Sequence, residues 1–149
     1  MSVTLPTSIP AGHGRTARVT GVTAPRPTTL PAVYRAAARL LAANGLHKGD
    51  YVPDPFDRRL KTRHEDRPLS VVAALRCAVA CSPHVIRPLS NEAIEFLADR
   101  LEVNGQSPYG RDLMALEFHV AEWGDVEDRT TESACAVLYA AADASEVTA

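Results

Sequence analysis

The most apolar run of the chain lies at its centre, between Arg67 and Pro83. From Ser70 onward its residues are mostly small or aliphatic, with one charge at Arg76, and its apolar positions recur at helical spacing in two stripes. A helix that is apolar nearly all round is usually buried. The run is too short to cross a membrane, which takes about 18 uncharged apolar residues. We therefore predict a central core helix that ends at Ser82, because the residue before a proline avoids the helical conformation.

Four other stretches repeat apolar residues every three or four positions, which is typical of amphipathic helices. They predict helices over residues 31–44, 91–102, 111–123 and 131–144. The first opens at a proline and ends at Asn44, just before Gly45. Ser90 is the expected N-cap of the second, and Thr130 or Thr131 is that of the last. Packed around one core, such helices predict an all-α fold, a single small domain of four to five helices, orthogonal or bundle-like, over residues 29–145.

Residues 1–28 differ from the rest of the chain, since they are rich in Thr, Pro, Gly and Arg, contain no acid and show no apolar periodicity. Such a segment cannot bury enough apolar surface to offset the entropy lost on ordering, so we expect a disordered basic tail. Two alternatives stay open. An organellar transit peptide has a similar Arg-rich, acid-poor composition, and a nucleic-acid-binding arm would use the same arginines.

Charge is distributed unevenly along the chain. The net charge is only −2, yet all 18 acids lie from Asp50 onward, and the residues before it carry bases alone. Three cysteines, Cys77, Cys81 and Cys135, are too few for a disulfide framework and indicate reduced thiols. No secretory segment follows the N-terminus. We therefore expect a cytoplasmic protein with no membrane partner.

Residues 46–67 form the least regular region inside the predicted domain. Turn-forming pairs that contain glycine or proline break it up, and side chains such as Tyr51 and Phe56 are expected to anchor it onto the core. A short extended pairing can form around residues 50–52. Bases cluster between residues 58 and 63. Long ordered loops often carry function.

The most site-like part of the sequence is the turn before the last predicted helix, residues 123–130, together with the loop that follows the first. The candidate ligand-binding residues are Trp123, Asp125, Asp128, Arg129, Tyr51 and Asp50. An indole beside carboxylates and a guanidinium can line a small-ligand pocket. The alternative is a structural corner in which Trp123 fills the core, one of the aspartates caps the last helix and Arg129 pairs with an acid.

Metal binding is a weaker interpretation of the cysteines. Cys77 and Cys81 stand four apart, with His84 three further on, and these would be the first ligands to test. Zinc, however, takes about four N or S ligands, usually on turns, and a Cys-x3-Cys pair inside a buried helix does not give that geometry. Buried thiols acting as small hydrophobes are the simpler explanation. We therefore expect no metal and no cofactor.

The sequence contains no recognised catalytic arrangement, and its histidines have no nucleophile beside them in a known motif. His119 is expected to be exposed or at a rim, because it lies on the opposite side of its helix from Leu113 and Leu116. A carboxylate metal site of the helix-bundle type is not indicated either. Glu117 and Glu122 are five apart, about 500° around a helix, so they do not share a face closely. No glycine-rich phosphate loop occurs. The balance of these patterns is against an enzyme.

Three blocks of the sequence carry a resemblance to a known family. They are Ala37–Tyr51 (AARLLAANGLHKGDY), Arg67–Ala80 (RPLSVVAALRCAVA) and Val120–Ala144 (VAEWGDVEDRTTESACAVLYAAADA). In order and spacing they resemble a small actinobacterial family known only as a domain of unknown function, whose members close with a Trp-Asn-Asp…Arg-Thr turn before a final helix. Here Gly124 replaces the asparagine, and Leu46 stands where an aromatic residue is common. The resemblance covers about residues 33–144 and implies homology and fold, but no activity.

Three functions remain compatible with these patterns. The lack of a catalytic constellation, the small size and the contrast between a basic tail and an acidic domain favour a non-enzymatic interaction or regulatory module with a protein partner. A nucleic-acid-binding regulator would use the bases at 58–63 between two helices as a helix-turn-helix variant, although the connection is far longer than the usual turn of about four residues. A small-ligand-binding protein or enzyme would place its site between the 46–67 loop and the 123–130 turn.

Overall fold

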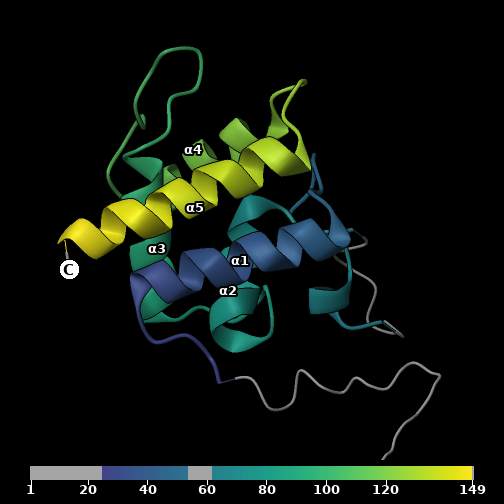
Figure 1. Ribbon diagram of the computed structural model, residues 1–149. Coiled ribbons are helices and arrows are strands. Elements are labelled where there is room, and N and C mark those ends of the chain that lie inside the picture. Colours follow the sequence, from purple (N-terminus) through teal and green to yellow (C-terminus); the bar gives the residue numbers. More distant parts are fainter. Residues whose placement is uncertain (1–24, 54–61, 149) are drawn as a thin grey trace, which may run out of the picture.

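The computed structural model describes residues 25–53 and 62–148. Over these residues the fold is all-α, without a β-strand, as the apolar periodicity predicts (Figure 1). The elements in chain order are α1 (Leu30–Asn44), the short 3-10 helix η3 (His64–Asp66), α2 (Val71–Ala80), α3 (Pro88–Ala98), α4 (Leu113–Asp125) and α5 (Thr131–Thr148). None of these helices is long and apolar enough to cross a membrane. The expected loop anchor Phe56, and most of the tail predicted over residues 1–28, lie outside the described part of the chain.

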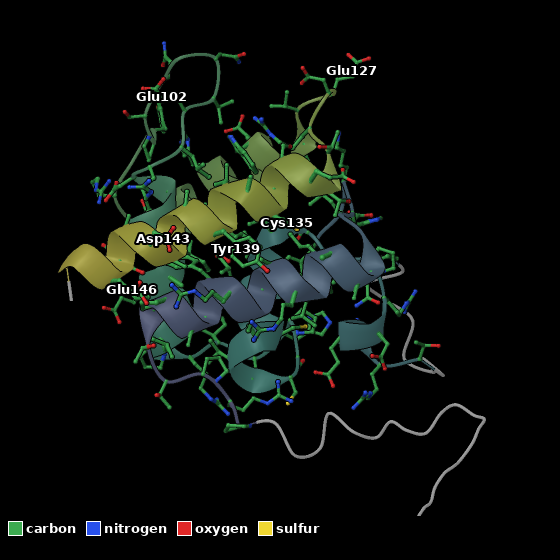
Figure 2. All side chains as sticks on the ribbon, viewed as in Figure 1. Glu102, Glu127, Cys135, Tyr139, Asp143 and Glu146 are labelled. Atoms are coloured by element: carbon green, nitrogen blue, oxygen red, sulfur yellow. The ribbon has the colours of Figure 1, made fainter. Side chains whose placement is uncertain are left out.

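Helices α1 and α5 lie antiparallel and side by side (Figure 1). α1 begins as predicted, with a proline in its first turn and Thr29 Oγ1 accepting a hydrogen bond from Ala32 N at 3.4 Å. Arg35 of α1 pairs with Asp143 and Glu146, near the C-terminal end of α5, at 3.4 and 3.0 Å (Figure 2). These groups are largely exposed, so the ion pairs contribute little. The two helices are held mainly by their buried apolar faces.

Helix α2 forms the centre of the core and packs against α1, α3 and α4. Every residue from Val71 to Ala78 is buried, so the central core helix predicted from the apolar run is confirmed. Ser70 caps this helix, since its Oγ accepts a hydrogen bond from Ala73 N at 3.2 Å. The cap and the apolar run together explain why the helix starts where it does.

The end of α2 corrects one prediction. The last helical residue is Ala80, because Cys81 adopts the left-handed conformation, with φ 67°, while its N–H donates to Cys77 O at 2.8 Å. This turn brings Cys81 to the surface, whereas Cys77 is buried. The prediction that both cysteines of the central helix are buried is therefore right for Cys77 and wrong for Cys81.

Helix α3 begins at Pro88 and not at residue 91. Ser90 is the third residue of the helix, where its Oγ donates to Arg87 O at 2.9 Å and accepts from Arg87 N at 3.3 Å. The prediction that Ser90 is the N-cap is therefore wrong, because the proline takes the first helical turn that suits it. Asp112 caps α4, with Oδ1 accepting from Ala115 N at 3.0 Å.

His119 of α4 is buried, with only 5% of the side chain exposed. Its Nε2 lies 2.7 Å from Leu101 O, in the chain that leaves α3. The prediction of an exposed or rim position is therefore wrong. That prediction assumed that only one side of α4 is buried. The chain that follows α3 covers a second side of this helix, on which His119 lies.

The segment after α1 runs beside the start of α2. Leu46 and Leu69 form an isolated parallel bridge, in which His47 N donates to Leu69 O at 2.9 Å. One more backbone hydrogen bond, from Ser70 N to Tyr51 O at 3.3 Å, joins the region where the sequence allows a short pairing. These bonds fix the loop against the N-terminal end of the core helix.

Candidate ligand-binding site

The segment after α1 and the turn after α4 are clamped together. Lys48 Nζ donates hydrogen bonds to Val126 O and Glu127 O at 2.8 and 2.9 Å. The ammonium group thereby satisfies carbonyl groups just past the C-terminus of α4, where a positive charge is favourable. Gly49 N donates to Asp125 Oδ1 at 3.0 Å. The loop and the turn between which the sequence suggests a site therefore meet.

A cavity of about 330 Å³ lies beside this contact, between the 46–53 segment, α2 and α4. Its apolar lining consists of Val71, Val72, Met114, Phe118, Val120, Ala121 and Gly124. Its polar lining consists of His47, Gly49, Asp50, Tyr51, Ser70, Arg76, Glu117 and Asp125. Gly124 lies where α4 approaches α2 closely, since a Cβ at this position would be 3.7 Å from Val71 Cγ2, in van der Waals contact.

Arg76 is the central polar side chain of the cavity wall. Only 7% of it is exposed, although it stands in the middle of the apolar helix α2. Its Nη1 donates to Tyr51 Oη at 3.1 Å, its Nη2 forms an ion pair with Glu117 Oε1, and its Cζ lies 5.8 Å from the centre of the Tyr51 ring. A buried charge is tolerated when it is paired and hydrogen-bonded. The three side chains therefore interlock α2, α4 and the loop.

Tyr51 is held by hydrogen bonds on both sides of its hydroxyl group. The oxygen accepts from Arg76 Nη1, and the hydroxyl donates to Pro83 O in the connection between α2 and α3. Burial raises the pKa of Tyr51 to about 12, an effect that Arg76 offsets only in part. The phenol therefore stays protonated at neutral pH and cannot serve as a base there.

Trp123 and Arg129 lie outside the cavity lining and form a structural corner. Trp123 is buried in the core, Arg129 Cζ lies 3.7 Å from the centre of an indole ring that it covers, and Arg129 Nε donates to Trp123 O at 2.9 Å. Thr130 caps α5, as one prediction has it, since its Oγ1 accepts from Ser133 N at 3.0 Å. The N-cap of α5 is therefore a threonine and not an aspartate. The guanidinium group of Arg129 stacks on the Trp123 indole and, among the described residues, does not pair with an acid in this corner.

The structure brings together three of the six candidate ligand-binding residues, Asp50, Tyr51 and Asp125, at the cavity. Asp128 is exposed on the turn and does not line it. Two lining residues, Arg76 and Glu117, are absent from the candidates. A signal for Arg76 exists in the sequence, because a lone charge in an apolar helix needs a buried partner. No local pattern identifies that partner as Glu117.

The cysteines and histidines near the end of α2 lie in different surroundings. Burial raises the pKa of Cys77 to about 12, so its thiol stays protonated, and Cys81 is exposed. His84 packs against His64, with ring centres 5.1 Å apart. Within residues 25–53 and 62–148, no group of three or more His, Cys, Asp or Glu side chains is arranged to hold a metal ion.

The basic cluster that a helix-turn-helix variant would need lies mostly outside the described residues. Its described arginine, Arg63, pairs with Glu65 at 2.9 Å and with Asp66 at 3.0 Å. The nucleic-acid hypothesis therefore stays a prediction.

No curated protein and no solved structure matches this chain. A family model does match, and its span contains every residue that lines the cavity. The resemblance to a domain of unknown function is thereby confirmed. The chain belongs to a family described as a family of unknown function (DUF6197), whose model matches residues 25–144.

Proposed function

We propose that this chain binds a small organic ligand that combines an apolar body with a positively charged group, in the cavity between the 46–53 segment, α2 and α4. The volume of about 330 Å³ lies at the lower end of the range of small-molecule pockets. An apolar wall with a few fixed polar groups is typical of such pockets. The observation that carries the proposal is the position of two exposed carboxylates, Asp50 and Asp125, beside this apolar wall.

The charges of the lining favour a cation. Arg76 is already engaged by Glu117, which leaves Asp50 and Asp125 without a balancing cation among the lining residues. Asp125 accepts one hydrogen bond, from Gly49 N, and a carboxylate has capacity for more. An ammonium group beside Asp50 and Asp125 is attracted by these carboxylates. The attraction becomes stronger as the apolar part of the ligand displaces water and lowers the local dielectric constant.

The lining suits binding better than catalysis. Tyr51 stays protonated, the hydroxyl group of Ser70 serves as the N-cap of α2, and Arg76 is paired with Glu117. These groups hold one another in place before any ligand arrives. Such preorganisation lowers the ordering cost of binding. The wall therefore acts as a fixed template.

The test uses three probes with the same chain length and different charge: n-hexylamine, n-hexanol and n-hexanoate. Each is titrated into the full chain while NMR records the backbone amide signals of Gly49, Val72 and Gly124. We expect n-hexylamine to bind with about tenfold higher affinity than n-hexanoate, which corresponds to about 1.4 kcal/mol. Equal affinity for the three probes, or shifts away from the cavity, would reject the proposal.

Two aspartate variants form a matched pair for the same titration. Asp125→Asn removes the charge and keeps an oxygen that can accept from Gly49 N, so the fold is preserved and the affinity for n-hexylamine should fall. Asp128→Asn makes the same change at an exposed position outside the cavity and should leave the affinity as it is. Equal effects of the two variants would mean that only the general charge of the surface matters.

A second candidate, the interaction module that binds a protein partner, is favoured by a different observation. Tyr109, Met114 and Phe118 are large apolar side chains that lie exposed near one another. Exposed apolar patches commonly mark interaction sites. The groove that they line supports a more specific inference.

A further inference from the structure

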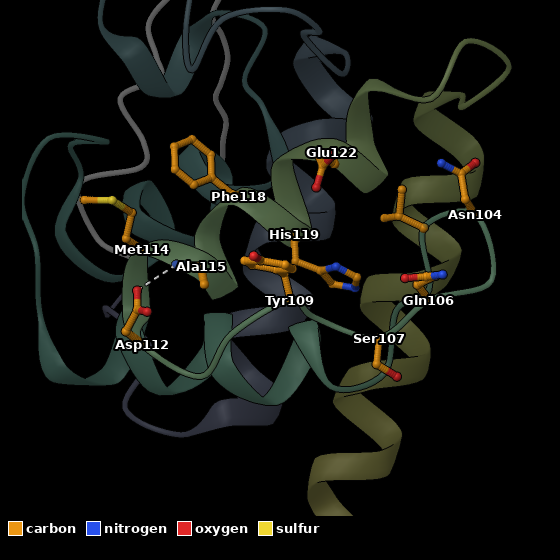
Figure 3. A pocket seen from close by; sticks show the side chains of 11 residues that line it. Asn104, Gln106, Ser107, Tyr109, Asp112, Met114, Ala115, Phe118, His119 and Glu122 are labelled. Carbon is orange, nitrogen blue, oxygen red and sulfur yellow. Dashed lines mark hydrogen bonds between the residues drawn. The ribbon is translucent and has the colours of Figure 1, made fainter.

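We propose that the groove between the 103–112 segment and α4 docks a basic segment of a partner protein, which inserts large apolar side chains between Tyr109 and Phe118. The groove has a volume of about 660 Å³. Figure 3 shows Asn104, Gln106 and Ser107 along one side of it, with Met114 and Phe118 of α4 on the other. This groove adjoins the ligand cavity, because Met114 and Phe118 of α4 line both.

The apolar side chains of the groove have the exposure of an uncovered interface. Tyr109 is fully exposed, Met114 is 65% exposed and Phe118 63%. In the described part of the chain, five large hydrophobic side chains are exposed, and these three line this groove. Met114 and Phe118 stand four apart on one face of α4, the spacing at which helical neighbours form a continuous surface. A partner that covers them removes this apolar area from water.

The charged residues that line the groove favour a partner with positive charge. Its charged lining residues are Asp112 and Glu122, and no lysine or arginine lines it. Both acids are exposed, so a partner's lysine or arginine can approach them without a large desolvation cost. Nucleic acid and anionic membrane surfaces carry the wrong sign for this groove. A polypeptide that combines basic and apolar side chains fits both the charge and the exposed aromatic rings.

The wall opposite α4 is already formed. Val103 and Gln106 exchange two backbone hydrogen bonds of 3.0 Å, and both residues of the turn between them, Asn104 and Gly105, have positive φ. An Asn-Gly pair is the typical sequence of such a two-residue turn. The end of the segment is tied to the end of α3 by a bidentate Arg111–Asp99 pair. A preformed wall lowers the cost of docking a partner.

The described surface of a second copy of this chain fits the groove less well than a separate partner. Outside the groove, the exposed large hydrophobics among the described residues are Ile86 and Tyr139. Ile86 has one basic neighbour, Arg87, and Tyr139 lies on α5 with the acids Asp143 and Glu146 (Figure 2). A single side chain fills little of a 660 Å³ groove. Self-association is therefore an outcome that the experiment has to distinguish.

The experiment measures the binding of fluorescein-labelled model peptides to the full chain by fluorescence anisotropy. The probe is a 14-residue amphipathic peptide of leucine and lysine. Two matched peptides replace lysine by glutamate or leucine by glutamine. We expect the Leu/Lys peptide to bind about tenfold more tightly than either control, and its affinity to fall with added salt.

Variants place the peptide on the groove. Tyr109→Ser should weaken Leu/Lys binding about tenfold, as loss of a central aromatic contact does. Tyr139→Ser, the same change at an exposed tyrosine on α5, should leave it unchanged. Both side chains are exposed, and circular dichroism checks that the variants stay folded. Binding of n-hexylamine by Tyr109→Ser should equal that of the wild type, so that failure of the groove and failure of the cavity are told apart.

Four outcomes would overturn the proposal. Equal binding of the Leu/Glu peptide removes the charge argument, and an unchanged affinity in Tyr109→Ser removes the location. A dimer in sedimentation that Tyr109→Ser dissociates would assign the groove to a second copy of this chain. Adsorption to vesicles of phosphatidylcholine and phosphatidylserine that the same variant abolishes would assign it to a membrane surface.

Discussion

Arg76 carries a positive charge within a helix whose other buried residues are apolar or small. A guanidinium group in that position costs several kcal/mol in desolvation unless partners compensate for it. Glu117 and Tyr51 supply the compensation from α4 and from the loop. The net gain in stability from such a group is small, so its main effect is to fix the three parts of the chain relative to one another. These three parts of the chain, α2, α4 and the loop, together form the wall of the ligand cavity.

The first prediction concerns the loss of one partner from this group. In Glu117→Ala, Arg76 stays buried without its ion pair, and we expect the free energy of unfolding in urea to fall by about 3 kcal/mol. Arg76→Met should cost less, because the side chain of Glu117 is 28% exposed and can be hydrated once it is alone. Glu122→Ala, at an exposed position of the same helix, is the control and should change stability by about 0.5 kcal/mol or less. Similar losses in both glutamate variants would contradict the pairing.

At the scale of elements, the helices themselves were predictable, because burial of one face is recorded in the local spacing of apolar residues. Their ends depend on competition between signals. Pro88 and Ser90 both favour a helix start, and the proline prevails. Cys81 ends α2 in a left-handed conformation without the glycine that usually announces one. The burial of His119 depends on the chain after α3, a contact that leaves no local trace.

The candidate site was predictable in part for the same reason. Turn chemistry and acids mark the loop and the turn, and Asp50 and Asp125 do line the cavity. An indole beside an arginine suits a pocket and a corner equally well in sequence, and the position of Trp123 outside the cavity lining depends on tertiary packing that no local pattern records. The pairing of Arg76 with Glu117 joins distant parts of the chain, so no spacing rule reveals it.

The contact between η3 and the connection after α2 leads to a prediction about how stability depends on pH. His64 of η3 packs edge-on against His84, with ring centres 5.1 Å apart. Burial, followed by the charges of His84 and Arg67, lowers the pKa of His64 below its ordinary value of 6.5. The unfolded chain therefore binds a proton more readily than the folded chain. We expect full stability above pH 6.5 and a decrease as the pH falls below that value.

Urea unfolding at about pH 7.5 and about pH 5.5 measures this dependence on either side of the ordinary histidine pKa. His64→Gln should lose part of the decrease on acidification, since it removes the group whose pKa differs between the two states. A wild-type dependence in His64→Gln would show that the ring contact is not its source.

At the scale of the whole molecule, the two hollows are neighbours on α4. Met114 and Phe118 line both the ligand cavity and the groove, whereas Val72 and Asp125 line the cavity alone and Tyr109 lines the groove alone. Both hollows also have more acidic than basic lining residues. The two proposed occupants would contact the same two side chains and carry the same sign of charge, so we expect the binding of one to weaken the binding of the other.

This arrangement leads to the last prediction, which rests on both proposals. The two proposed occupants would contact the same side chains, Met114 and Phe118, and two cationic occupants repel each other. A saturating concentration of the Leu/Lys peptide should therefore weaken the binding of n-hexylamine by about fivefold or more, and the amine should weaken the peptide by the same factor, because coupling between two sites is reciprocal. NMR titration of the amine, with and without the peptide, measures the first factor, and fluorescence anisotropy measures the second.

Tyr109→Ser separates this coupling from direct competition. Tyr109 lines the groove and not the cavity, so the variant should bind the peptide about tenfold less tightly and keep its affinity for the amine. If the peptide weakens amine binding in Tyr109→Ser as strongly as in the wild type, its lysines enter the cavity itself and the hollows are not coupled through α4. If neither ligand changes the affinity of the wild type for the other, the cavity and the groove are not coupled and the prediction is wrong. An effect that is present in the wild type and reduced in the variant at the same peptide concentration assigns the coupling to occupation of the groove.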